Sequence, residues 1–216
     1  MPAFPQGRHA GAVVPLDRAN VDTDAIFPKQ YGRSTARSGF GPVLFDSWRY
    51  LDPGDLTSDH GRRRLNPDFV LNRPELQGAT VLLARANFGC GSSREHAVWA
   101  LRDHGFRAVL APSFGDIFRQ NCPLNGVAAI VLPDADVGQL FALARAGVLR
   151  VTIDVEAGRV GCDGGVFRFA LPERERRLLT TDVDWIGATL AHSPLIEAYE
   201  ARHLLRRPWL GKVLDP

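Results

Sequence analysis

The amino-acid sequence predicts an α/β fold with a mostly parallel central sheet, helices packed on it and a small antiparallel β element. Short apolar runs alternate with helix-forming segments between residues 79 and 147, as in a sheet covered by helices. Strand-like pieces separated by glycines follow between Leu149 and Leu171, which is typical of an antiparallel meander. The 216 residues, of which 45% are hydrophobic and 23% charged, suffice for one sizeable domain with a proper core.

The first 69 residues predict loops that join short strands, because glycine, proline and aspartate are frequent there. The start of the chain lacks the apolar stretch of a signal peptide, since Pro15 and Asp17 interrupt its one short apolar run. No stretch approaches the length of a membrane span. We therefore expect a cytoplasmic protein that does not associate with membranes. An odd number of widely spaced cysteines, without a C-x-x-C pair, also argues against a disulfide framework: Cys90, Cys122 and Cys162.

The middle of the chain predicts three strands and three helices in alternation. The strands are short apolar runs at residues 79–85, 107–112 and 126–133. The helices are expected at residues 93–105, 113–122 and 134–147, where glycines at 105 and 147 end the first and the last. Strands that alternate with helices in this way form parallel or mixed sheets.

The last part of the chain predicts the antiparallel element and then a helical tail. Residues 149–155, 158–162 and 166–171 are the strand-like pieces, and residues 184–204 return to a helical pattern. Within the tail, Pro194 begins a second helix, with Ser193 as its N-cap.

A net charge of +2 is too mild to indicate nucleic acid as a partner, and the basic clusters at 61–65 and 201–209 lack interleaved stacking aromatics.

The stretch FGCGSSREHAVWAL, residues 88–101, places a glycine-rich turn, two serines and an arginine at the start of a helix. One interpretation is a capping box, in which Ser92 and Glu95 satisfy the first helical amides. Phosphate loops do not fit, because Arg94 occupies the third glycine position of G-x-G-x-x-G and no G-K-[ST] is present. A G-x-S-x-G nucleophile turn fails because Gly91 stands in place of its serine, and Cys90 with one nearby histidine is a weak signal for a thiol nucleophile.

We favour an anion site that contains a base. A strand that runs into a helix N-terminus presents free amides and the positive end of the helix dipole. Arg94 adds a planar fork that can bind a carboxylate through two hydrogen bonds. In such a field a serine hydroxyl can act as a base toward a proton alpha to a carboxylate, because preorganised dipoles stabilise the alkoxide.

Several blocks of the sequence, in order, resemble the swivelling domain of the aconitase superfamily. The likeness is closest to the small subunits of 3-isopropylmalate dehydratases, and it runs nearly end to end. It implies a single swivelling β/β/α domain over residues 1–216, with a helical tail at about 184–216. The blocks include VVPLDRANVDTDAIFPKQY, VLLARANFGCGSSREHAVWAL, GFRAVLAPSFGDIFRQN and DWIGATLAH.

The resemblance implies a hydro-lyase that isomerises 2-isopropylmalate and 3-isopropylmalate in leucine biosynthesis by dehydration and rehydration. Ser92 would be the catalytic base, and the substrate would be bound by Ser93, Arg94, Arg37, Asp24 and Gly91. A 4Fe–4S cluster with one open iron would be held by a separate large subunit, so this chain alone would bind no metal and be inactive. The expected partners are therefore that large subunit and a small hydroxy-dicarboxylate.

One loop departs from the family pattern. It reads QYGRST, residues 30–35, with Gly32 where the family usually carries a leucine after the aromatic residue. Gly32 lacks the apolar side chain that would contact an isopropyl group of the substrate. An alternative substrate therefore stays open, with the same chemistry on methylmalate and citraconate or a related hydroxy-dicarboxylate. A non-catalytic binding or regulatory module is the alternative from another class.

Overall fold

The computed structural model describes residues 4–181 and 185–213. The chain divides into two compact units, residues 1–181 and residues 182–216. The first unit contains every strand of the described chain, and the second contains helical segments only. The assignment of residues 1–216 to one swivelling domain with a tail stays a prediction. No helix among the described residues is long and apolar enough to cross a membrane.

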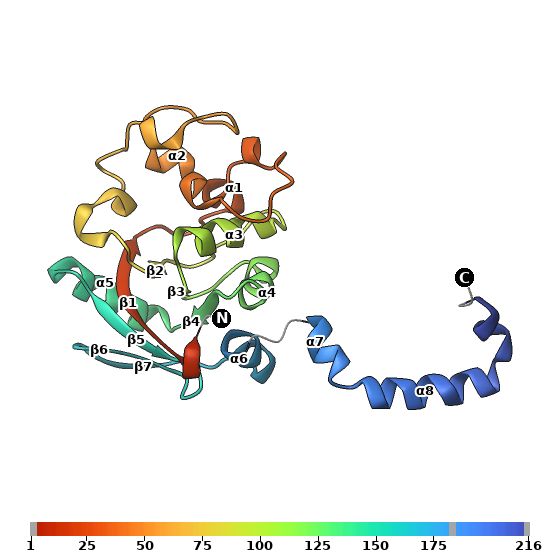
Figure 1. Cartoon of the computed structure of the whole chain (residues 1–216). Helices are drawn as coiled ribbons and strands as arrows, with labels where there is room; N and C mark the ends of the chain where they lie inside the picture. The colour runs from red at the N-terminus through yellow and green to blue at the C-terminus, as the bar shows by residue number, and fades with distance from the viewer. Residues whose placement is uncertain (1–3, 182–184, 214–216) are drawn as a thin grey trace. The chain divides into compact units, whose positions relative to one another are not determined.

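The first unit is built on one seven-stranded mixed sheet (Figure 1). The strand order is β4-β3-β2-β1-β5-β6-β7, in which the pairs on the β4 side of β1 are parallel and those on the β7 side are antiparallel. The strands are β1 (Arg8–Leu16), β2 (Val81–Ala84), β3 (Ala108–Ala111), β4 (Ala128–Val131), β5 (Arg150–Asp154), β6 (Arg159–Cys162) and β7 (Gly165–Arg168). The predicted fold class is confirmed, and the antiparallel meander extends the same sheet.

Strand β1 joins the two halves of the sheet, and it is longer than the sequence pattern predicted. Its first five residues pair with β5, as in Gly11 opposite Val151, and its last four pair with β2, as in Val13 opposite Val81. Pro15 therefore lies where β1 is paired on one side only, a place in which a missing N–H is tolerated. The expectation of short strands in this region was wrong for the nine residues of β1.

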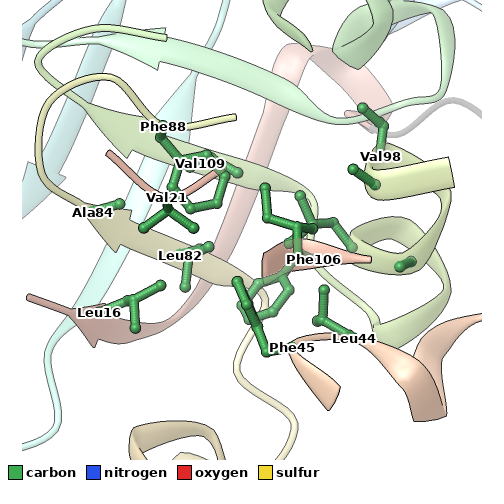
Figure 2. Packing of buried hydrophobic residues seen from close by; sticks show 14 of the residues in the cluster. Leu16, Val21, Leu44, Phe45, Leu82, Ala84, Phe88, Val98, Phe106 and Val109 are labelled. Carbon is green, nitrogen blue, oxygen red and sulfur yellow. The ribbon is translucent and has the colours of Figure 1, made fainter. Parts of the chain in front are cut away.

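Helices cover both faces of the sheet, so the core has two layers. Alternate residues of β1, β2 and β3 contribute to opposite clusters: Val14 and Leu82 to one, Val13 and Val81 to the other. The first cluster also takes side chains from α3 and α4, as Figure 2 shows in part. The second is closed by α5 and α6. The helices of this unit are α1 (Thr23–Ile26), α2 (Asp46–Arg49), α3 (Glu95–His104), α4 (Asp116–Leu124), α5 (Asp134–Ala146) and α6 (Glu173–Thr180).

The helices α3, α4 and α5 begin and end within three residues of the bounds that the sequence predicted. Gly105 ends α3 with a φ of 116°, a left-handed conformation that glycine adopts without strain. Helix α3 begins two residues later than expected, at Glu95, which leaves both serines in the preceding turn.

The second unit contains α7 (Trp185–Leu190), α8 (Ser193–Arg206) and a 3₁₀ turn at Pro208–Val213. Pro194 lies in the first turn of α8, as predicted. The expectation that Ser193 is the N-cap was wrong, because His192 holds that position and the Ser193 hydroxyl donates to Leu190 O at 2.7 Å. Helix α8 has no buried residue.

Candidate active site

The glycine-serine turn lies at the carboxyl ends of the parallel strands. After β2 the chain continues beside its neighbours, with bridges between Cys90 and Asp22 on one side and between Phe88 and Phe114 on the other. Segments that follow β1, β2 and β3 are therefore brought together at this edge of the sheet. In open α/β sheets this edge is where ligands bind.

Two glycines shape the turn. Gly89 has a φ of 73°, and a Cβ atom on it would lie 2.2 Å from the Phe118 ring. Its amide donates to Val21 O at 2.7 Å, which holds the turn against the segment after β1. Gly91 has a φ of 92° but more room, since its nearest neighbour would be Asp22 Cβ at 3.5 Å. The sequence G-C-G is thus required by conformation at both glycines and by packing at the first.

Both serines are exposed on this turn. The N-cap of α3 is Arg94, and no side chain caps the helix. The capping box of Ser92 and Glu95 is therefore not formed. The amide of Arg94 instead donates to Ser92 O at 2.9 Å, within the turn itself. The two hydroxyls lie just before the positive end of a ten-residue helix.

Thr23, in the sequence Asp-Thr-Asp at residues 22–24, contacts the serine turn. Its hydroxyl donates to Ser92 O at 3.0 Å and lies 3.1 Å from Ser92 Oγ. Its amide donates to Cys90 O at 2.9 Å. Thr23 is 1% exposed, and it opens α1 under the cap of Asp22, whose Oδ1 accepts from Ala25 N at 2.6 Å. Sequence reasoning missed Thr23, because only the fold brings residues 23 and 92 together.

Arg94 is held by Asp24 and by the main chain of α1. Its Nη1 forms an ion pair with Asp24 Oδ1 and lies 3.5 Å from Phe27 O. The pair is half-exposed, so its contribution to stability is at most about 1 kcal/mol. Two residues after Arg94, the ring of His96 stacks on Phe27, with ring centroids 5.2 Å apart, and its centroid lies 4.7 Å from that of the Trp99 ring. Asp24 thus orients the guanidinium of Arg94. The carboxylate of a ligand can bind this guanidinium together with Asp24 or in its place.

The loop from Tyr31 to Phe40 is anchored at both ends. Tyr31 is buried, and its hydroxyl donates to Asp46 Oδ1 at 3.0 Å. Burial and the Asp46 carboxylate raise the pKa of Tyr31, so it stays protonated. Asp46 also forms a buried ion pair with Arg63.

At the other end of this loop, Phe40 N donates to Asp103 Oδ2 at 3.0 Å, and Arg102 Nη2 donates to Arg37 O at 3.0 Å. Both partners are in the last turn of α3, the helix whose other end carries the serine turn. Arg37 is exposed on the anchored loop, and within the part of the chain that the structure describes its side chain forms no hydrogen bond or ion pair with the serine turn. Gly32 and Arg33 are exposed as well.

The structure thus brings five of the six predicted site residues to one surface: Gly91, Ser92, Ser93, Arg94 and Asp24. Arg37 lies on the neighbouring loop. The roles assigned to these residues stay predictions. The buried pair Asp46–Arg63 was missed, because its members lie 17 residues apart in sequence and only the fold brings them together.

The three cysteines lie on separate elements. Cys90 is in the serine turn, Cys122 is buried in α4, and Cys162 is in β6. Burial raises the pKa of the Cys122 thiol well above its ordinary value, which disfavours the thiolate that iron requires. Within residues 4–181 and 185–213, no three histidine, cysteine or acidic side chains come together as a metal site. Among the described residues, the three cysteines are therefore not arranged as ligands of one iron–sulfur cluster.

Comparison with known proteins finds two matching family models, a similar curated protein and a similar solved structure. Residues 5–135 match the aconitase C-terminal domain family, and residues 186–212 match the family of C-terminal domains of 3-isopropylmalate dehydratase small subunits. A 3-isopropylmalate dehydratase small subunit from Methylibium petroleiphilum is 55% identical over 208 residues, which are 95% of this chain and 96% of that relative. The crystal structure of a 3-isopropylmalate dehydratase from Methanocaldococcus jannaschii is similar with a TM-score of 0.61 and 25% identity, over 89% of this chain and 99% of that one.

Proposed function

The chain belongs to the family of 3-isopropylmalate dehydratase small subunits, and we propose that it supplies the proton-transferring half of that enzyme's active site. With a large subunit it isomerises 2-isopropylmalate and 3-isopropylmalate in the cytoplasm, by dehydration and rehydration, as a step of leucine biosynthesis. The observation that carries the proposal is the exposed pair of serine hydroxyls beside Arg94, at the start of α3.

The geometry suits removal of a proton alpha to a carboxylate. The exposed Ser92 hydroxyl first gives its proton to water. The resulting alkoxide, as the base, takes the proton from the substrate carbon, and the electron pair of that C–H bond forms the double bond as the hydroxyl departs. The positive end of α3 and the guanidinium of Arg94 stabilise the negative charge on the serine oxygen before the transfer. The reverse sequence adds water with the hydroxyl on the neighbouring carbon.

The remaining site residues bind and orient the substrate. Arg94 and Ser93 bind one carboxylate, and Asp24 holds the guanidinium of Arg94 in place. Gly91 lets the substrate approach the backbone closely, because it is exposed and carries no side chain of its own. Arg37, on the loop anchored to α3, binds the second carboxylate.

The 4Fe–4S cluster belongs to the large subunit in this proposal, because the cysteines of this chain do not come together. A cluster bound there would supply the Lewis acid for the departing hydroxyl. The site is then complete only when the two subunits associate. Stoichiometric iron and sulfide in the purified small subunit, or turnover by it alone, would contradict this division.

The substrate stays the isopropyl compound in this proposal although Gly32 departs from the family pattern. The chain shares 55% identity with a 3-isopropylmalate dehydratase small subunit over nearly all of both chains, which outweighs one position in an exposed loop. A panel of the isopropyl and methyl malates with the reconstituted enzyme tests it. Preference for the methyl compound would favour the citraconate alternative.

The test of the whole proposal is Ser92→Ala, with Ser93→Ala and Ser47→Ala beside it in the reconstituted enzyme. Ser92→Ala should lower kcat by about 10²- to 10⁴-fold, the contribution of a positioned base, while subunit association survives. Ser93→Ala should mainly raise KM, and Ser47, exposed on α2, should tolerate alanine without effect. Unchanged turnover of Ser92→Ala would reduce the turn to a structural feature and favour a binding module.

A further inference from the structure

We propose that Thr23 is a positioning residue that holds the serine turn in its catalytic shape and orients the Ser92 hydroxyl. The inference rests on the proposed role of Ser92 as the base. Thr23 itself does not reach the surface, because only 1% of it is exposed, so it acts through Ser92. Its hydroxyl lies 3.1 Å from Ser92 Oγ although 69 residues separate the two in sequence.

The turn is folded around Thr23. The Thr23 amide donates to the carbonyl of Cys90 at 2.9 Å, and the Thr23 hydroxyl donates to the carbonyl of Ser92 at 3.0 Å. Between these two carbonyls lies Gly91 in a left-handed conformation, where a Cβ atom would lie 3.7 Å from Thr23 Oγ1. One buried residue therefore fixes the turn at two points, on either side of the glycine that lets it bend.

The hydrogen bonds also determine where the proton of Ser92 points. A threonine hydroxyl has one proton, and a carbonyl oxygen can only accept. While Thr23 donates to Ser92 O, it can only accept from Ser92 Oγ, so the serine proton points at Thr23 and the serine lone pairs face outward.

Both acceptors lie within 3.1 Å of the same threonine oxygen. Rotation of the Thr23 hydroxyl about its C–O bond therefore moves its proton from Ser92 O to Ser92 Oγ. Once Ser92 has given its own proton to water, Thr23 in that orientation donates to the negatively charged serine oxygen. Hydrogen bonds to a charged acceptor are the stronger ones, so this bond favours the form that takes the substrate proton.

Thr23 is suited to this role by its own rigidity. It is the first residue of α1, which Asp22 caps through the 2.6 Å bond from Ala25 N. A β-branched side chain has few rotamers, and burial removes further freedom. A serine at this position would keep the hydroxyl and lose only the methyl group that helps to fix it.

The test compares Thr23→Val, Thr23→Ser and the control Thr80→Val in the reconstituted two-subunit enzyme. Thr80 also hydrogen-bonds through its hydroxyl, to His9 Nε2 at 2.7 Å, but it precedes β2 at the opposite end from the serine turn. We expect Thr23→Val to lower kcat by about 10- to 100-fold with KM within about threefold, somewhat below the loss of a full oxyanion donor. Thr23→Ser should restore kcat to within about threefold, and Thr80→Val should change stability and leave kcat unaltered.

The double variants separate this inference from the proposed function. If Thr23 acts through Ser92, adding Thr23→Val to Ser92→Ala should change the residual rate by less than about twofold, because residues that act as a unit are not additive. An equal loss in both backgrounds would overturn the inference, as would full kcat in Thr23→Val when Ser92→Ala is inactive. An active Ser92→Ala enzyme would instead refute the proposed function. Thr23→Ala serves as a second hydroxyl-free variant should the valine variant fail to fold.

Discussion

Replacement of Arg63 by methionine should destabilise the small subunit far more than the same replacement of its neighbour Arg64. Each arginine forms an ion pair with an aspartate earlier in the chain, Arg63 with Asp46 and Arg64 with Asp52. The side chains of the first pair are 6% and 2% exposed, and those of the second are 73% and 31% exposed. The two variants therefore remove the same kind of bond from a buried and from a solvated site.

The magnitude follows from what each variant leaves behind. Without Arg63, the carboxylate of Asp46 stays buried with the Tyr31 hydroxyl, 3.0 Å away, and no cation. An uncompensated buried charge of this kind costs about 3–5 kcal/mol. Without Arg64, Asp52 turns to water, so the loss is at most about 1 kcal/mol.

Thermal and urea unfolding of the isolated small subunit measure this difference. At about 2–4 °C per kcal/mol for a chain of this size, Arg63→Met should lower Tm by about 6–20 °C, and Arg64→Met by no more than about 4 °C. The double variant Asp46→Asn with Arg63→Met should recover most of the loss, because no charge is buried and the amide oxygen still accepts from Tyr31. Equal effects of the two methionine variants would refute the reasoning, since burial would then not decide the energy of the pair.

Three further predictions concern the serine turn, the loop that carries Arg37, and the half-buried His104. Gly89→Ala should destabilise the fold by about 1–3 kcal/mol more than Gly91→Ala in urea unfolding, because both have positive φ but a Cβ atom overlaps an aromatic ring only at Gly89; equal losses would exclude the steric part. Arg37→Ala should raise KM at least about tenfold in the reconstituted enzyme while Arg33→Ala leaves it unchanged, since only Arg37 is proposed to bind a carboxylate; a matching rise in both would indicate a general loop effect. Burial lowers the pKa of His104 to about 4, so the unfolded chain binds a proton below pH 6.5 that the folded chain does not. Stability should therefore fall between pH 7 and pH 5, by about 2 kcal/mol from this group, and His104→Gln should be less sensitive to that change in urea unfolding; identical pH dependence would refute the assignment.

The sequence by itself determined the local elements of this protein. The apolar runs at β2, β3 and β4 predicted short strands, the pattern at residues 134–147 predicted the helix α5, and the structure confirms them. The sequence predicted that Gly105 ends a helix, because the left-handed conformation at a helix end depends only on adjacent residues. The two glycines and two serines marked the turn, since the signal lies within a few adjacent residues.

Tertiary structure decided how these elements meet. The role of β1 could not be inferred from its own residues, because it depends on β2 pairing at one end and β5 at the other. The same holds for Thr23 against Ser92 and for Asp46 against Arg63, which lie 69 and 17 residues apart in sequence. Periodicity and capping are short-range effects, whereas burial and hydrogen-bond partners depend on which distant segments the folded chain brings into contact.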